Sequence, residues 1–215
     1  MKLNFVQAYP RTFKRWVTQI SKDPGSWIQT SLIILLLSIP VITWGFAYGF
    51  GHVVSYRRSV GYRIKLKIEI SEYFHSKQAR NCFLMGILDI LVLGLTICTL
   101  RSLIIPEASK FSRIISSLFI WFDLVYWMSS LYRYPIMALD RESSFSEGIV
   151  QSLFLTVTKL GHSMFFLLFK VSILIVSLVT GIGIFVFFLG SLSLLNVHHW
   201  LEVLGDDQIA TSFQD

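Results

Sequence analysis

Charged residues are scarce in this chain. Only 15% of its 215 residues are Asp, Glu, Lys or Arg, whereas an average soluble domain contains about 25%. Apolar residues make up 53% of the sequence, and the mean hydropathy is +0.62. Because so few polar side chains remain to cover a water-facing surface, we predict an integral membrane protein whose main partner is the lipid bilayer.

Motifs for catalysis and for metal binding are also missing. No phosphate-binding loop, Ser/His/Asp pattern or CxxC spacing occurs. Cys82 and Cys98 fall in one apolar run, where a helix would place them roughly 24 Å apart, too far for a disulfide. His198 and His199, considered together with His162, suit one metal ion poorly because neighbours on a helix point about 100° apart. We therefore predict no enzyme activity, no metal and no cofactor.

The net charge of +6 is compatible with nucleic acid binding. The Lys and Arg residues, however, lie beside the apolar runs, which is typical of the cytoplasmic side of a membrane protein. We therefore expect no nucleic acid partner.

Two apolar runs have the length of a single membrane crossing. They are Cys82–Leu100 and Ile114–Tyr132, each close to the ~20 residues that a spanning helix needs. Each run contains one charged residue, Asp89 in the first and Asp123 in the second. A short polar turn is expected between the runs, at residues 106–110.

The first apolar region, residues 27–56, is too long for one crossing. As one helix it would extend about 45 Å, whereas the hydrocarbon core is ~30 Å thick. Pro40, Gly45 and Gly49 interrupt it. Two interpretations are open: a single tilted and kinked span, or two short helices that return to the side from which they entered.

The last apolar region, residues 163–204, presents the same choice. Gly181 and Gly183 interrupt it near its middle. Helix breaks at corresponding places in two halves can mark a transport site, and glycines also allow close helix packing. Because no charged residue lies beside either break, packing is the favoured interpretation.

The distribution of positive residues helps to choose between these topologies. If both regions double back, fifteen of the nineteen Lys and Arg residues share one side, three face the other, and Lys170 lies within the membrane. If the first region crosses once, the division is ten against eight. The positive-inside rule favours a first region that doubles back, with a cytoplasmic N-terminus. The last region and the side of the C-terminus stay open.

Two amphipathic segments accompany the apolar ones. Residues 1–26 form a basic lead-in that suits the headgroup plane, ended by a Pro-Gly break with Ser26 as the expected N-cap of the next helix. Residues 140–162 carry an apolar stripe at helical spacing, which predicts an amphipathic helix at the interface or under the bundle. Residues 60–71 alternate apolar and polar, which is typical of a short strand or of a basic segment on anionic lipid.

The fold predicted from these features is an all-α, polytopic helical bundle. It has two continuous spans, a first and a last apolar region broken by Pro and Gly, and an interfacial amphipathic helix. The domain organisation is a lead-in over residues 1–26, a transmembrane domain over residues 27–204, and an acidic tail over residues 205–215.

Three short motifs resemble those of bacterial YesL-like membrane proteins, a group that includes the membrane domain attached to some glycerophosphodiester phosphodiesterases. The motifs are Ile39-Pro40-Val41-Ile42-Thr43-Trp44-Gly45, then Tyr134-Pro135-Ile136-Met137-Ala138-Leu139-Asp140 followed by Ser146-Glu147-Gly148, and Gly181-Ile182-Gly183. The resemblance implies a multi-pass protein of the bacterial cytoplasmic membrane. It supplies no catalytic residue.

Three charged residues lie within apolar runs, where an unpaired charge is costly. On the favoured topology Asp89 and Lys170 are both roughly 10 Å deep, so we expect them to pair, whereas Asp123 lies nearer the middle. Such groups either form a proton or ion path, or hold helices together, with Lys170 also able to extend to the headgroups.

The functional prediction is therefore an accessory or assembly component of a bacterial membrane system, working with another membrane protein or as a homo-oligomer. The alternative is a small transporter or channel-like subunit that uses the broken helices and the intramembrane Asp and Lys. A lipid-directed enzyme is a third hypothesis, without a candidate nucleophile.

Overall fold

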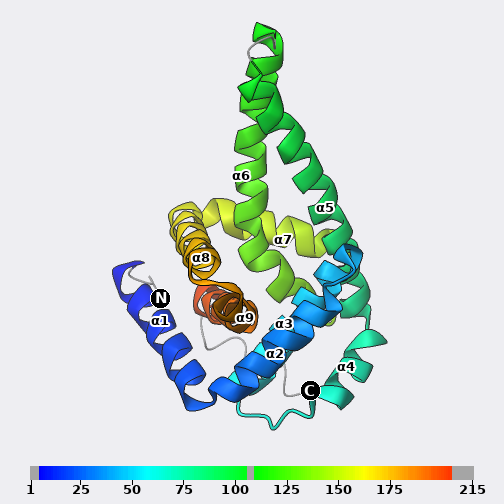
Figure 1. The fold of residues 1–215 in the computed structure, drawn as a ribbon, viewed down its shortest axis with the longest axis vertical. Helices are drawn as coiled ribbons and strands as arrows, with labels where there is room; N and C mark the ends of the chain where they lie inside the picture. The colour runs from blue at the N-terminus through cyan, green and yellow to red at the C-terminus, as the bar shows by residue number, and fades with distance from the viewer. Residues whose placement is uncertain (1–4, 106–108, 205–215) are drawn as a thin grey trace.

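The computed structural model describes residues 5–105 and 109–204, and within these ranges the chain is helical without strands (Figure 1). The helices are α1 (Phe5–Lys22), α2 (Pro24–Leu37), α3 (Trp44–Ser59), α4 (Leu66–Phe74), α5 (Lys77–Ile104), α6 (Lys110–Leu139), α7 (Phe145–Thr158), α8 (Leu160–Thr180) and α9 (Ile182–Leu204), with a 3-10 turn, η1 (Val41–Thr43), before α3. The all-α prediction is confirmed. The acidic tail and most of the turn predicted at residues 106–110 lie outside the described residues.

Helices α5 and α6 form a long hairpin that projects from the other helices (Figure 1). Both are long and apolar enough to cross a membrane, and the pair α7 and α8, bent by 100°, makes a third candidate span. The two predicted continuous spans are thus confirmed as unbroken helices. The outer half of the hairpin exposes large apolar side chains, which suits contact with lipid. These include Leu91, Ile97, Leu100, Phe111, Ile114, Leu118, Trp121 and Phe122.

The first apolar region doubles back, because its two ends meet. Arg58, at the end of α3, donates from Nη1 to the carbonyl of Ser26 at 2.7 Å and to the hydroxyl of Thr30 at 2.9 Å, both in α2. The turn contains Pro40, whose lack of an N–H and fixed φ do not suit a helix interior. The prediction of two short helices that return is confirmed, and a single kinked span is wrong.

The last apolar region doubles back in the same way. The imidazole rings of His162, in the first turn of α8, and His199, near the end of α9, stack with their centroids 5.0 Å apart. The reversal occurs at Gly181, whose φ of +113° is accessible to glycine and strained for other residues. Helix α9 then packs against α1, α2 and α3.

Close backbone contact fixes where α3 crosses α5. A Cβ atom added to Gly86 would lie 2.5 Å from the backbone N of Gly45, and one added to Gly49 would lie 2.5 Å from the Sγ of Cys82. Gly45 and Gly49 both lie inside α3, so the helix breaks predicted at these two glycines are wrong, and each lies where α3 and α5 pack closely. Gly183 is part of α9 but lies outside the residues whose packing is described.

The two amphipathic segments contain helices, α1 in the first and α7 in the second. Asp23, not Ser26, is the N-cap of α2, because its carboxylate accepts the backbone N–H of Ser26 at 3.2 Å; the Ser26 prediction is wrong. Helix α7 begins with a capping box in which the side chains of Ser144 and Glu147 each accept the other's backbone N–H. It packs small residues against α6 and exposes Val150, Phe154 and Val157.

Of the two alternatives for residues 60–71, the strand is wrong. The chain turns at Gly61, whose φ is +93°, continues irregularly to Lys65, and enters α4 at Leu66. Helix α4 is held by Arg57, which pairs with the carboxylates of Glu69 and Glu72. Since Glu69 and Glu72 are three residues apart, a helix presents both to one guanidinium, whereas a strand would direct them to opposite faces.

Candidate functional site

A buried ion pair joins the two long helices. The Nη2 of Arg133 in α6 lies 3.2 Å from the Oδ1 of Asp89 in α5. Arg133 is 0% exposed and Asp89 is 5% exposed. Two tyrosines of α6 complete the cluster: the hydroxyl of Tyr126 donates to Oδ1 of Asp89 and that of Tyr134 donates to Oδ2, each at 2.6 Å.

The geometry of this Asp89–Arg133 cluster follows from helix periodicity. Tyr126 and Arg133 are two helical turns apart, so they share the face of α6 that meets α5. The guanidinium carbon of Arg133 lies 3.7 Å from the centroid of the Tyr126 ring, close enough for a cation–π interaction. Since an isolated buried charge is very costly, this pairing allows both charges to remain inside the bundle.

The expected pair between Asp89 and Lys170 is wrong. The Nζ of Lys170 lies 5.4 Å from the centroid of the Tyr48 ring, and the described partner of Asp89 is Arg133. The reason is that α6 continues as a helix beyond Tyr132 and through Pro135 to Leu139. The predicted span ended at Tyr132, so Arg133 lay outside it. In the structure the longer helix holds Arg133 against Asp89. Its spacing of seven residues from Tyr126 is the signal that could have identified it.

A second polar group lies where α3 meets α9. The side-chain amide of Asn196 donates to the hydroxyl of Tyr48 at 2.9 Å and lies 3.4 Å from the Nε2 of His52. The Nδ1 of His52 lies 2.8 Å from the carbonyl of Tyr48. The ring of Tyr134 packs edge-on against Tyr48 with a centroid separation of 4.9 Å. Tyr134 therefore contacts both polar groups.

Asp123 is placed apart from these clusters. It is 4% exposed in α6, and neither carboxylate oxygen has a hydrogen-bond partner among the described residues. Of the three predicted intramembrane charges, the structure gives Asp89 an ionic partner and Lys170 an aromatic neighbour, and it brings no two of the three into a described contact.

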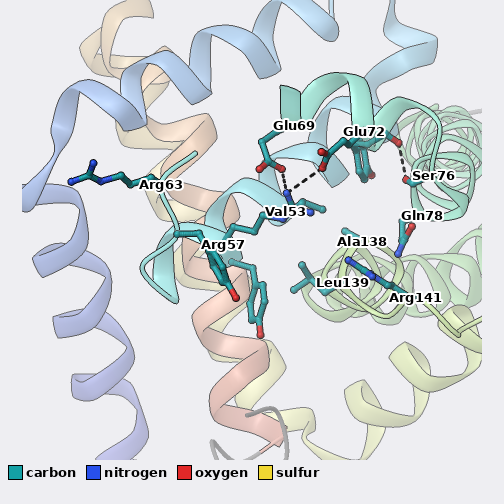
Figure 2. Close-up of a pocket in the computed structure, with 13 residues that line it drawn as sticks. Val53, Arg57, Arg63, Glu69, Glu72, Ser76, Gln78, Ala138, Leu139 and Arg141 are labelled. Atoms are coloured by element: carbon teal, nitrogen blue, oxygen red, sulfur yellow. Dashed lines mark hydrogen bonds and ion pairs between the residues drawn. The ribbon is translucent and has the colours of Figure 1, made fainter. Parts of the chain in front are cut away.

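The polar cavity, as we name it, has a volume of about 660 Å³ and lies where α3 and α6 end and α5 begins (Figure 2). Arg57 occupies one wall with its partners Glu69 and Glu72, the latter at 3.6 Å. Figure 2 shows Gln78 and Arg141 on the opposite wall. Its charged lining makes it suited to a polar ligand or to a charged segment of another protein.

The polar cavity also brings together two stretches that lie far apart in the sequence, residues 57–80 and residues 133–159. Residues 57–80 contribute Arg57 and Arg63 to its lining, and residues 133–159 contribute Arg141. The charge distribution assigned both stretches to one side of the membrane, and in the structure they meet at this cavity.

The histidines make separate contacts. The Nε2 of His198 lies 3.0 Å from the side-chain oxygen of Gln19, whereas His199 stacks on His162. Within residues 5–105 and 109–204, no group of three or more His, Cys, Asp or Glu side chains is arranged to hold a metal ion.

Comparisons with known proteins identify no family. The resemblance to YesL-like proteins therefore stays a prediction from the sequence. The chain matches no protein-family model, no curated protein and no solved structure.

Proposed function

We propose that this protein is a non-catalytic integral membrane protein that acts as an accessory or assembly component of a bacterial membrane system. The observation that carries the proposal is the burial of the Asp89–Arg133 ion pair between α5 and α6. Both oxygens of Asp89 are occupied by Arg133, Tyr126 and Tyr134. A transport site must expose its charges to a substrate, whereas these charges neutralise one another between two helices.

We propose that the partner protein binds at the polar cavity. Its walls carry both signs of charge, with Glu72 side chain 60% exposed and Arg141 also exposed. Complementary charges give specificity and steer association. The positive-inside rule puts this cavity on the cytoplasmic side, together with the N-terminus, and the YesL-like resemblance supports the bacterial cytoplasmic membrane. The partner is then another membrane protein with a mixed-charge cytoplasmic segment.

Site-specific photocrosslinking in the native membrane tests this proposal. A photoreactive side chain replaces Gln78, which lines the polar cavity, and the matched control carries it at Leu100, which is exposed on the α5–α6 hairpin. We expect a discrete protein adduct from position 78 and none from position 100. The adduct from position 78 should be lost in Arg141→Glu, which reverses the sign of one charge in the cavity wall. Equal adducts at both positions, or none at 78, would contradict the proposal; an adduct between two copies of this chain would replace it with a homo-oligomer.

A second candidate, a small transporter, is favoured by one contact. Tyr134 hydrogen-bonds to Asp89 and packs against Tyr48, which is hydrogen-bonded to Asn196 of α9. These contacts connect polar side chains from α5, through α6 and α3, to α9. Proton flux into proteoliposomes discriminates the two functions: the accessory function predicts none, whereas a pH-driven flux lost in Asp89→Asn would establish the transporter.

A further inference from the structure

A second cavity, of about 480 Å³, lies beside the turn of the first hairpin. We name it the apolar cavity. The turn between α2 and α3 forms one side of it, α4 another, and the first turns of α5 a third. Its lining residues are Leu36, Leu37, Pro40, Thr43, Phe46, Ile70, Phe74, Ala79, Arg80 and Phe83.

Only two lining residues of the apolar cavity are polar. The hydroxyl of Thr43 already donates to the backbone carbonyls of Leu37 and Pro40 in the hairpin turn. Arg80 is the one charged lining residue, it is exposed, and it forms no ion pair with a carboxylate in the described part of the chain. The cavity therefore combines an apolar interior with a single available positive charge.

This combination makes the cavity a poor site for ordered water, because its apolar walls offer few polar partners. A cavity this size would hold many molecules of about 30 Å³ each, and each needs two to four polar partners. The volume instead falls within the ~300–1,000 Å³ of small-molecule sites, which are mostly apolar with a few polar groups that orient the ligand.

The surroundings of the cavity indicate that its ligand enters from the bilayer. Exposed apolar side chains surround the hairpin turn and extend to α4, and they are Leu36, Ile39, Val41, Ile42 and Phe74. Arg80 lies in the first turn of α5, just before the apolar run begins at Cys82, which is the level at which a spanning helix meets lipid headgroups. Phe83 lies about one turn further along α5.

We propose that the apolar cavity binds one acyl chain of an anionic membrane phospholipid, whose phosphate pairs with Arg80. The chain lies between Phe46, Phe74 and Phe83, and van der Waals contacts with these walls favour binding. The guanidinium forms charge-assisted hydrogen bonds to the phosphate oxygens. A bound lipid of this kind joins α4 to the hairpin turn, because its chain contacts α3, α4 and α5 together.

Native mass spectrometry of the full chain in detergent tests the proposal, with phosphatidylglycerol as the probe and phosphatidylcholine as the neutral comparison. We expect one retained phosphatidylglycerol per chain, bound more tightly than phosphatidylcholine. Arg80→Gln should weaken phosphatidylglycerol binding about twofold to fivefold and remove the preference, as expected for one exposed ion pair. The matched control, Arg141→Gln, changes an arginine of the polar cavity and should leave binding unchanged.

Two further measurements locate the lipid and keep the test decisive. Ala79→Phe fills the cavity and should abolish the retained lipid; a thermal melt shows whether this variant is folded. Phe74→Trp places a fluorophore in the wall, and a phospholipid brominated on its acyl chain should quench the added emission relative to the parent protein. Equal effects of the two arginine variants, no lipid preference, or no quenching at position 74 would overturn the proposal, as would equally tight binding of free palmitate.

Discussion

The pair between Asp89 and Arg133 can be tested by a double-mutant cycle. The variants are Asp89→Asn, Arg133→Met and the double substitution. Each has nearly the volume of the parent side chain, so the changes act mainly on charge. Loss of one member of a buried ion pair costs about 3–5 kcal/mol, because the other charge is left uncompensated.

The two single variants should differ in cost because their residual partners differ. In Arg133→Met, Asp89 still accepts hydrogen bonds from Tyr126 and Tyr134 at 2.6 Å each, and hydrogen bonds to a charged group contribute about 1.5–3 kcal/mol. In Asp89→Asn, the partner left to Arg133 among the described residues is the face of Tyr126, 3.7 Å from its guanidinium carbon. We therefore expect about 3 kcal/mol for Arg133→Met and about 5 kcal/mol for Asp89→Asn.

The double variant should cost less than the two single variants added together, with a coupling of about 1–3 kcal/mol between the two sites. The free energy of unfolding is measured by titrating SDS into mixed micelles and following the near-UV circular dichroism of the tyrosines. Lys170→Met is the control, since Lys170 contacts Tyr48 and not the cluster, and it should be additive with Asp89→Asn. If Asp89 and Arg133 are additive within about 0.5 kcal/mol, the reasoning is refuted.

Three further predictions follow from local contacts. Gly86→Ala should destabilise the fold by about 1–3 kcal/mol in the same titration, because its Cβ meets the backbone of Gly45, whereas Gly94→Ala, with open space around it, should be neutral or stabilising; equal effects would argue against the close crossing. Arg57→Gln should release α4 and speed proteolysis between residues 60 and 66, and Arg63→Gln should not; unchanged cleavage would contradict the role of Arg57 in holding α4. The backbone N–H of Ser144 donates to Glu147 and lowers the pKa of that carboxyl below its ordinary value of 4.5. A lowered folded pKa means that the cap stabilises α7 fully above the ordinary pKa and weakens as pH falls through the lowered one; amide-exchange protection of the first turn should follow this course, and Glu147→Gln should remove the pH dependence.

Helix length and helix breaks were predictable because they depend on local chemistry. The runs ending at Leu100 and Tyr132 contain no proline, so both spans follow from apolar length. The first hairpin follows from Pro40 and from the asymmetry of positive charge. Gly181 predicted an interruption of the last region but did not decide between one long span and a hairpin. Helix length and helix breaks therefore depend on the sequence of a single segment and not on which other helices it contacts.

The buried cluster was not predictable in the same way, because it depends on which helices meet. Apolar length ended the second span at Tyr132, so Arg133 was counted as a loop residue, although α6 continues through Pro135. Tertiary contact also overrides local pattern at residues 60–71. There the alternation predicts a strand, but pairing of Glu69 and Glu72 with Arg57 stabilises a helix. The polar cavity has the same origin, since three helix ends separated in sequence create it.

The position of α9 has a consequence for biosynthesis. Trp16 donates from its indole N–H to the carbonyl of Ser191 at 2.7 Å, and the N–H of Gly190 donates to the hydroxyl of Ser31 at 2.7 Å. These pairs are separated by 175 and 159 positions in the chain. Helices α1 and α2 therefore lack these contacts with α9 until α9 has been synthesised. A nascent chain that stops before Gly181 leaves these helix faces uncovered in the membrane, where quality-control proteases recognise unassembled helices.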